Sequence, residues 1–213
     1  MRNPSLYRIG GSALVIGAVL DGVALLIHPP QPMDLTAFAA LPHGQWVAAH
    51  WLFSVGTVFL VAGLLALARH LFGTNGDGWA TIGFGATIVT GALFVAIVAP
   101  EIVGFSALAQ SGADAGAQHA YNAINLNLMS LVHVAGPLFW LGGACFGLAM
   151  MNDGAFPRWL GQLGAALGVV EIASNWLLAN SWLGFRVVFL AGFVWLAYTG
   201  YTLSKVKVAV TVH

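Results

Sequence analysis

Histidines and carboxylic acids are the residues of this chain whose placement points to chemistry. Two histidines, His50 and His133, lie inside long apolar stretches, and Asp21, Glu171 and Asn175 interrupt others. Ionisable side chains are costly to place inside a bilayer, so there they usually pair with one another or mark a binding site or proton pathway. These five residues are therefore the candidate site residues.

The spacing of the histidines restricts the kind of metal site they can form. His43 and His50 lie about 10 Å apart along one helix, and His119 and His133 about 21 Å apart, so neither pair can share an ion. A metal site must recruit across helices, with His50 and His133 as the first ligands. Two imidazoles at matched depth suit axial ligation of a haem iron, or one ligates while the other hydrogen-bonds. The alternative is that the polar groups only hold helices together by hydrogen bonds.

The composition places the chain in a membrane. It is 59% hydrophobic and 7% charged, with a mean hydropathy of +0.87, whereas soluble domains have about 25% charged residues. The seven basic and seven acidic residues balance, and no basic tract is present, so nucleic acid is excluded as a partner. The lipid bilayer is the expected partner. The single cysteine, Cys145, lies in an apolar run and is interpreted as a small hydrophobic residue.

Hydropathy and helix breakers predict an all-α, polytopic bundle of six transmembrane helices. A spanning helix needs about 20 mostly apolar residues. Prolines at 29, 30, 32 and 100 and a glycine-rich turn at 73–78 separate the segments. We expect residues 1–213 to form a single integral membrane domain. The predicted helices cover residues 11–28, 44–68, 79–99, 121–150, 159–179 and 185–204.

Basic residues predict the orientation of the bundle, because short cytoplasmic loops are rich in lysine and arginine. Six of the seven fall on one face, and the expected opposite loops, 29–43 and 100–120, contain none; Arg186 is the exception. We therefore expect a multi-pass protein of a bacterial inner (cytoplasmic) membrane with both termini cytoplasmic. Six of the seven histidines then fall toward the extracytoplasmic side. The six basic residues are Arg2, Arg8, Arg69, Arg158, Lys205 and Lys207.

The two middle hairpins share a pattern. Each has a histidine, an apolar helix, a turn rich in Asn and Gly, a tryptophan and a glycine-rich helix, running from His50 to Trp79 and beyond and from His133 to Trp159 and beyond. If this is a duplication, the hairpins run parallel and both histidines lie at similar depth in the outer half of the bilayer. The alternative is that such turns and interfacial tryptophans recur in any membrane hairpin.

Two family resemblances follow from short motifs. Residues 43–70 and 156–161 resemble a broad group of uncharacterised six-helix bacterial membrane proteins. His133-Val-Ala-Gly136, followed by Glu171-Ile-Ala-Ser-Asn175, resembles the haem-ligating histidine and the Asp-x-x-Ser-Asn segment of the membrane-bound styrene oxide isomerases. That resemblance implies a ferric haem b that rearranges an epoxide to an aldehyde. The chain differs from those enzymes in having Glu171 for aspartate, Ala179 for an expected tyrosine, and six predicted helices instead of four.

The leading hypothesis is a haem b-binding membrane protein with a His/carboxylate pocket, acting as an isomerase-like enzyme on a small hydrophobic ligand or as an electron carrier. His133 would be the preferred iron ligand and His50 the second ligand or acid/base. Glu171 and Asn175 would orient the substrate, with Asp21 as a further acid of the pocket. The alternatives are a proton-coupled small-molecule transporter, in which Asp21 and Glu171 titrate, and a structural accessory subunit of a membrane complex. A homo-oligomer stays open.

Overall fold

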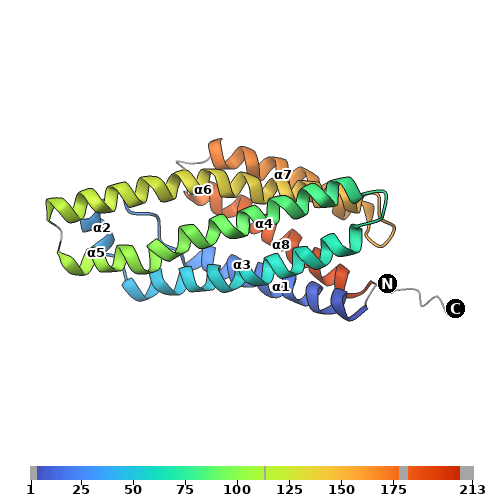
Figure 1. The fold of residues 1–213 in the computed structure, drawn as a ribbon, viewed down its shortest axis with the longest axis horizontal. Coiled ribbons are helices and arrows are strands. Elements are labelled where there is room, and N and C mark those ends of the chain that lie inside the picture. The colour runs from blue at the N-terminus through green and yellow to red at the C-terminus, as the bar shows by residue number, and fades with distance from the viewer. Residues whose placement is uncertain (1–3, 113, 178–181, 207–213) are drawn as a thin grey trace.

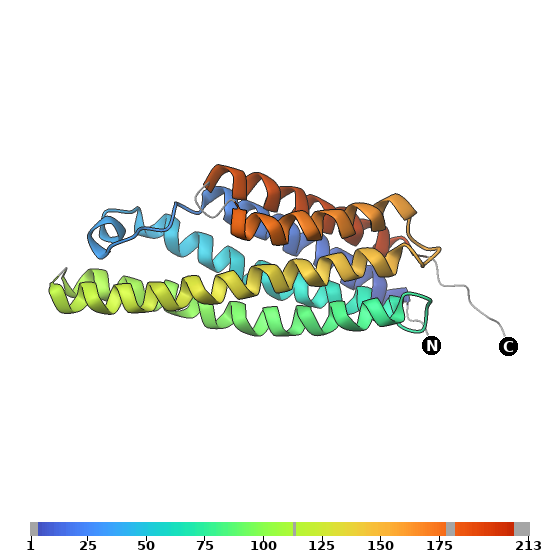
Figure 2. The ribbon, with the colours of Figure 1, turned by 90° about the horizontal axis from the view of Figure 1, so that it is seen from above.

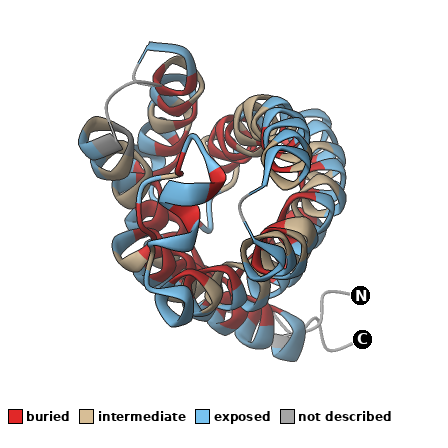
Figure 3. Cartoon of the chain, turned by 90° about the vertical axis from the view of Figure 1, so that its left-hand side faces the viewer, coloured by how far each residue is buried: buried red, intermediate tan, exposed pale blue. Residues whose placement is uncertain are grey.

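The computed structural model describes residues 4–112, 114–177 and 182–206, which form an elongated bundle of long helices (Figure 1). Viewed from one end of the bundle, buried residues gather where helices face one another (Figure 3). The all-α prediction is confirmed. The long helices are α1 (Pro4–Ile27), α3 (His43–Leu71), α4 (Asp77–Ala99), α6 (Ala115–Met150), α7 (Arg158–Leu177) and α8 (Trp182–Ser204).

Each of the six predicted segments forms a long helix over its described residues; positions 178 and 179 of the fifth segment, including Ala179, lie outside them. Five stretches of the described chain are long and apolar enough to cross a membrane, so the protein is a multi-pass membrane protein. The segment that corresponds to α7 is not among them, and the count of six spans stays a prediction, as does the hairpin duplication. The five stretches are Ser5–Ile27, His43–Leu71, Asp77–Ser111, Ala115–Met150 and Arg186–Ser204.

The structure differs from the sequence prediction in the two segments expected to be loops. Residues 100–120 are largely helical, because α4 continues through a π-helical turn, η1 (Pro100–Gly104), into α5 (Phe105–Ser111), and α6 already begins at Ala115. The segment 29–43 contains a short helix, α2 (Leu35–Ala39), whose N-terminal amide at Ala37 is capped by Asp34.

Glycines bring several helix pairs into close contact. On α1, Gly17 packs so closely on α3 that a Cβ there would lie 2.7 Å from the Gly56 carbonyl oxygen. On α6, a Cβ at Gly147 would lie 2.6 Å from the carbonyl oxygen of Gly161 on α7. Small residues permit this backbone approach, which is the usual basis of helix association in lipid. The pairs α1–α3 and α6–α7 are therefore tightly packed, and so is α1 against α8, where a Cβ at Gly200 would lie 2.6 Å from the Gly11 carbonyl oxygen.

Exposed tryptophans and basic residues delimit a membrane-wide band. On α7, Trp159 and Trp176 are 51% and 65% exposed and lie about 26 Å apart along the helix. On α3, the exposed Trp51 lies about 27 Å from Arg69. Both separations approach the roughly 30 Å of a hydrocarbon core flanked by interfacial aromatics. One end of the band, here called the basic end, carries Arg8, Arg69, Arg158 and Lys205.

The opposite end extends beyond the band as a helical cap, made of α2, η1, α5 and residues 115–130 of α6, at the left of Figures 1 and 2. The 36 residues of α6 span about 54 Å, more than a bilayer requires. The cap has its own hydrophobic core, in which Phe38, Trp46, Phe105 and Tyr121 are buried. This second core holds the loop after α1 against α4, α5 and α6.

Candidate functional site

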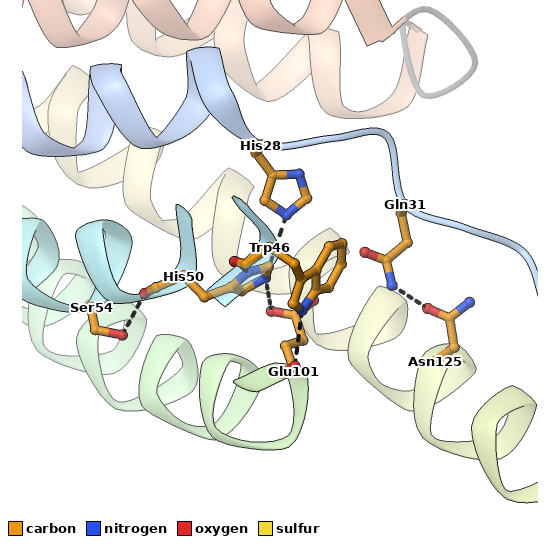
Figure 4. Close-up of polar contacts among 7 residues, drawn as sticks. All are labelled: His28, Gln31, Trp46, His50, Ser54, Glu101 and Asn125. Atoms are coloured by element: carbon orange, nitrogen blue, oxygen red, sulfur yellow. Dashed lines mark hydrogen bonds and ion pairs between the residues drawn. The ribbon is translucent and has the colours of Figure 1, made fainter. Parts of the chain in front are cut away.

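A buried group of titratable side chains lies where the cap meets the membrane band. Its centre is His50, on the second turn of α3, whose Nδ1 lies 2.8 Å from the carbonyl oxygen of Trp46 (Figure 4). A carbonyl oxygen only accepts hydrogen bonds, so Nδ1 carries a proton and donates it. In the neutral ring Nε2 then has a free lone pair. The i−4 carbonyl thus fixes both the tautomer and the ring orientation of His50.

Two further titratable side chains converge on His50 Nε2. Glu101 Oε2 lies 3.1 Å away and His28 Nε2 lies 3.4 Å away (Figure 4). His28, His50 and Glu101 are only 8%, 2% and 6% exposed. We call these three residues the histidine–glutamate cluster. They come from the end of α1, from α3 and from η1, so the fold joins three separate segments at one nitrogen atom.

The geometry limits the protons that the cluster can hold. Between His50 Nε2 and Glu101 Oε2 there is room for one proton. Either His50 is an imidazolium beside a carboxylate, or a protonated Glu101 donates to a neutral ring. A buried, unpaired charge would be costly, and both arrangements avoid it. Because His28 Nε2 faces the same nitrogen atom, the three side chains meet at one point.

Each member of the cluster is held by its own backbone. The His28 amide continues α1 by donating to Ala24, and its carbonyl accepts a hydrogen bond from Arg186 of α8. The Glu101 carbonyl accepts from Trp46 Nε1 at 3.0 Å. Glu101 lies in the π-helical turn, in which the Phe105 amide bonds to the Pro100 carbonyl. Such turns occur frequently at functional sites because they redirect side chains.

The cap covers the cluster with aromatic rings and polar ties. The Trp46 ring lies 4.4 Å from the His50 ring and 5.0 Å from the His28 ring, measured between centroids. Tyr121 donates to the Pro32 carbonyl at 2.9 Å. Gln31 donates to Asn125 at 3.0 Å (Figure 4). These ties hold the proline-rich loop after α1 onto α6 and so fix His28 in place.

The environment of His28 disfavours its charged form. Burial, followed by the charge of His50, lowers the pKa of His28 from 6.5 to about 3. His28 is therefore neutral at pH 7 and faces His50 as a neutral ring.

The other predicted site residues lie elsewhere. On α6, the half-buried His133 stacks on Trp176 of α7, with ring centroids 5.7 Å apart and an interplanar angle of 20°. Glu171 is fully buried, and neither carboxyl oxygen has a hydrogen-bond partner among the described residues. Asn175 donates to the Glu171 backbone carbonyl at 2.9 Å. These three residues share the α6–α7 interface.

Asp21 occupies a third position. It is 4% exposed and packs against Gly56 at the α1–α3 interface, with Thr57 within hydrogen-bonding reach. Its Oδ1 atom has no hydrogen-bond partner among the described residues. Within the described chain no hydrogen bond, ion pair or ring contact joins His50 to His133 or to Asp21. The candidate residues therefore fall into three groups.

Sequence reasoning missed the partners of His50. It did not single out His28 or Glu101, and it did not identify the buried pair of His70 and Asp153, 3.3 Å apart at the basic end. One signal was present: His28 precedes a proline and Glu101 follows one. Both residues thus mark the end of a regular helix, where a side chain can turn inward.

Metal ligation was a predicted role for His50 and His133. No group of three or more His, Cys, Asp or Glu side chains in the described ranges is arranged to hold a metal ion. For haem, the fit is poor at two points. His50 Nε2 faces Glu101, and the space beside Gly136 is filled by Asn175, since a Cβ at Gly136 would lie 2.6 Å from Asn175 Oδ1. Haem binding itself stays a prediction.

Comparison with known proteins finds no matching family, no similar curated protein and no similar solved structure. The two family resemblances therefore remain hypotheses based on short motifs.

We expect the stability of the protein to fall as the pH is lowered from about 6.5 toward 3, in part because of His28. The unfolded chain takes up a proton at the ordinary pKa of 6.5, whereas folded His28 does so only near 3. The unfolded state thus binds more protons in this window, which costs up to about 1.4 kcal/mol of folding free energy per pH unit.

The measurement is denaturant unfolding in detergent micelles between pH 7 and pH 4. His28→Asn should show a shallower pH dependence than the wild type, by up to one proton. His43→Asn, at an exposed position, should retain the wild-type slope. Identical slopes for His28→Asn and the wild type would contradict the assignment.

Proposed function

We propose that this protein is a proton-coupled membrane carrier for a small molecule, and that the histidine–glutamate cluster takes up and releases the coupled proton. The observation that carries the proposal is that three buried titratable side chains meet at His50 Nε2, with Glu101 Oε2 3.1 Å and His28 Nε2 3.4 Å from it. The cluster lies at the boundary of the membrane band, close to the aqueous phase with which a coupled proton must be exchanged. Ionisable residues at such positions commonly serve proton relays in pumps and transporters.

Titratable groups also occur at deeper levels of the bundle. Asp21 lies about 10 Å along α1 from His28, and His70 lies about 30 Å along α3 from His50. Glu171 adds a buried carboxyl group on α7. Protonatable groups therefore occur near both ends and within the membrane band, as proton transfer across it requires.

The packing of the helices favours a carrier over a channel. Gaps of about 10 Å and more between the titratable groups are too long for a direct hydrogen bond, so water molecules or a coupled movement must bridge them. The glycine-packed pairs α1–α3 and α6–α7 can act as two rigid units, and rocking of such units is the usual basis of alternating access.

Glu101→Gln tests the proposal. Glutamine retains the shape and the hydrogen-bonding capacity of glutamate but has no titratable proton. We expect the variant to fold and to lose proton-driven uptake by at least tenfold. The assay is uptake of a panel of labelled amino acids, sugars and organic acids into proteoliposomes under an imposed proton gradient, with and without a protonophore.

Asp34→Asn is the matched control, because it removes a carboxylate on the surface of the cap and should leave uptake unchanged. Uptake in Glu101→Gln equal to that in the wild type would contradict the role of the cluster. A panel without any gradient-dependent substrate would contradict the carrier itself.

The second candidate function is haem binding at His133. One observation favours it: the buried Nδ1 atom of His133 has no hydrogen-bond partner among the described residues, so its imidazole is not committed to the internal network. A bound haem b would supply Lewis-acid or redox chemistry. His133 would hold the iron, and Glu171 and Asn175 on the facing helix would orient a small apolar substrate, once Asn175 leaves the space beside Gly136 that it fills in this structure.

The absorption spectrum of the purified protein, with and without added haem, tests this candidate. The haem hypothesis predicts a Soret band that is lost in His133→Ala and retained in His119→Ala, a change at an exposed histidine. A folded, colourless protein that gains no band on addition of haem would eliminate the candidate.

A further inference from the structure

An apolar groove runs along the membrane-facing surface between α7 and α8. The two helices lie side by side in Figure 2, where they form the upper edge of the bundle. The groove has a volume of about 430 Å³ and is walled by Leu163 and Leu167 of α7 and by Ala191 and Val194 of α8. These residues lie within the membrane band, so the groove is open to lipid.

The floor of the groove is rigid. It is formed by Leu160 and Trp195, both of which are buried. The Trp195 ring packs directly on Gly164, because the side chain of any larger residue at position 164 would collide with the ring. Its Nε1 donates a hydrogen bond to the Leu160 carbonyl at 3.0 Å. The groove is therefore preformed, which lowers the entropic cost of filling it.

The mouth of the groove lies at the basic end and is aromatic and cationic. The rings of Trp159 and Tyr198 lie 5.4 Å apart, and the Tyr201 ring lies 6.2 Å beyond Tyr198. The Lys205 ammonium lies 5.4 Å from the centre of the Tyr201 ring. Arg158, which precedes Trp159, is exposed. Aromatic rings beside lysine and arginine are the usual surroundings of lipid headgroups.

We propose that the groove binds an anionic phospholipid, with one acyl chain between α7 and α8 and the phosphate beside Arg158 and Lys205. From Trp159 to Leu167 the groove extends about 12 Å into the band, so a chain anchored at the mouth lies along its floor. Opposite charge selects an anionic headgroup over a neutral one. A symmetric contact with a second copy would bring Arg158 and Lys205 of both copies together, which like-charge repulsion disfavours.

The test uses phospholipids with brominated acyl chains, which quench tryptophan fluorescence on contact. Brominated phosphatidylglycerol and brominated phosphatidylcholine are titrated separately into the full-length protein in detergent micelles. We expect the phosphatidylglycerol to quench at the lower concentration. Arg158→Gln and Lys205→Gln should each weaken its binding about fivefold, as expected for one basic residue near a lipid surface, without changing the effect of phosphatidylcholine.

Two further variants separate the groove from the general protein surface. Ala191→Phe fills the groove and should abolish the preference for the anionic lipid, whereas Val89→Phe, at an exposed position of α4, should retain it. Equal quenching by the two lipids, or no effect of either charge variant, would overturn the proposal. A fall in oligomer mass of Ala191→Phe, measured by light scattering, would assign the groove to a second copy and overturn it as well.

Discussion

The arrangement at the cap depends on one hydrogen bond, from His50 Nδ1 to the carbonyl of Trp46. This bond assigns the ring proton and leaves Nε2 directed at Glu101 and His28. Without this bond, the His50 ring could turn over and direct Nδ1 instead of Nε2 at the Glu101 carboxyl group. Burial makes this choice consequential, because an unpaired charge at the edge of a bilayer is far more costly than one in water.

The structure around this bond buries it and fixes its geometry. The π-helical turn at Pro100–Gly104 directs Glu101 inward, and Trp46 holds the backbone of that turn. The second hydrophobic core, beyond the membrane band, anchors the loop that carries His28. The glycine-packed helices below supply a stable base, and their close packing leaves the polar groups of the interior at separate levels.

The positions of the helices were predictable because a membrane helix is encoded locally, by about 20 successive apolar residues. The helical nature of 100–111 was not, since Pro100 usually ends a helix and here is absorbed by a π-helical turn. The early start of α6 depends on a local cap, in which Asp114 accepts from the Ala117 amide at 2.7 Å. The first turns of α6 are polar, so hydropathy did not indicate that the helix begins at Ala115.

His50 was identified as a candidate because an ionisable side chain in an apolar helix is costly to bury. Its partners, however, lie on other elements. Contacts between residues so far apart in sequence depend on helix packing, which spacing along one chain does not encode.

Sharing of protons around His50 Nε2 is the central claim, and nitrogen NMR of protein labelled in its histidine rings tests it most directly. We predict that Nδ1 of His50 stays protonated throughout the pH range in which the protein is folded, while the Nε2 signal changes with pH and shifts in Glu101→Gln. An Nε2 signal that is the same in the wild type and in Glu101→Gln at every pH would contradict the account.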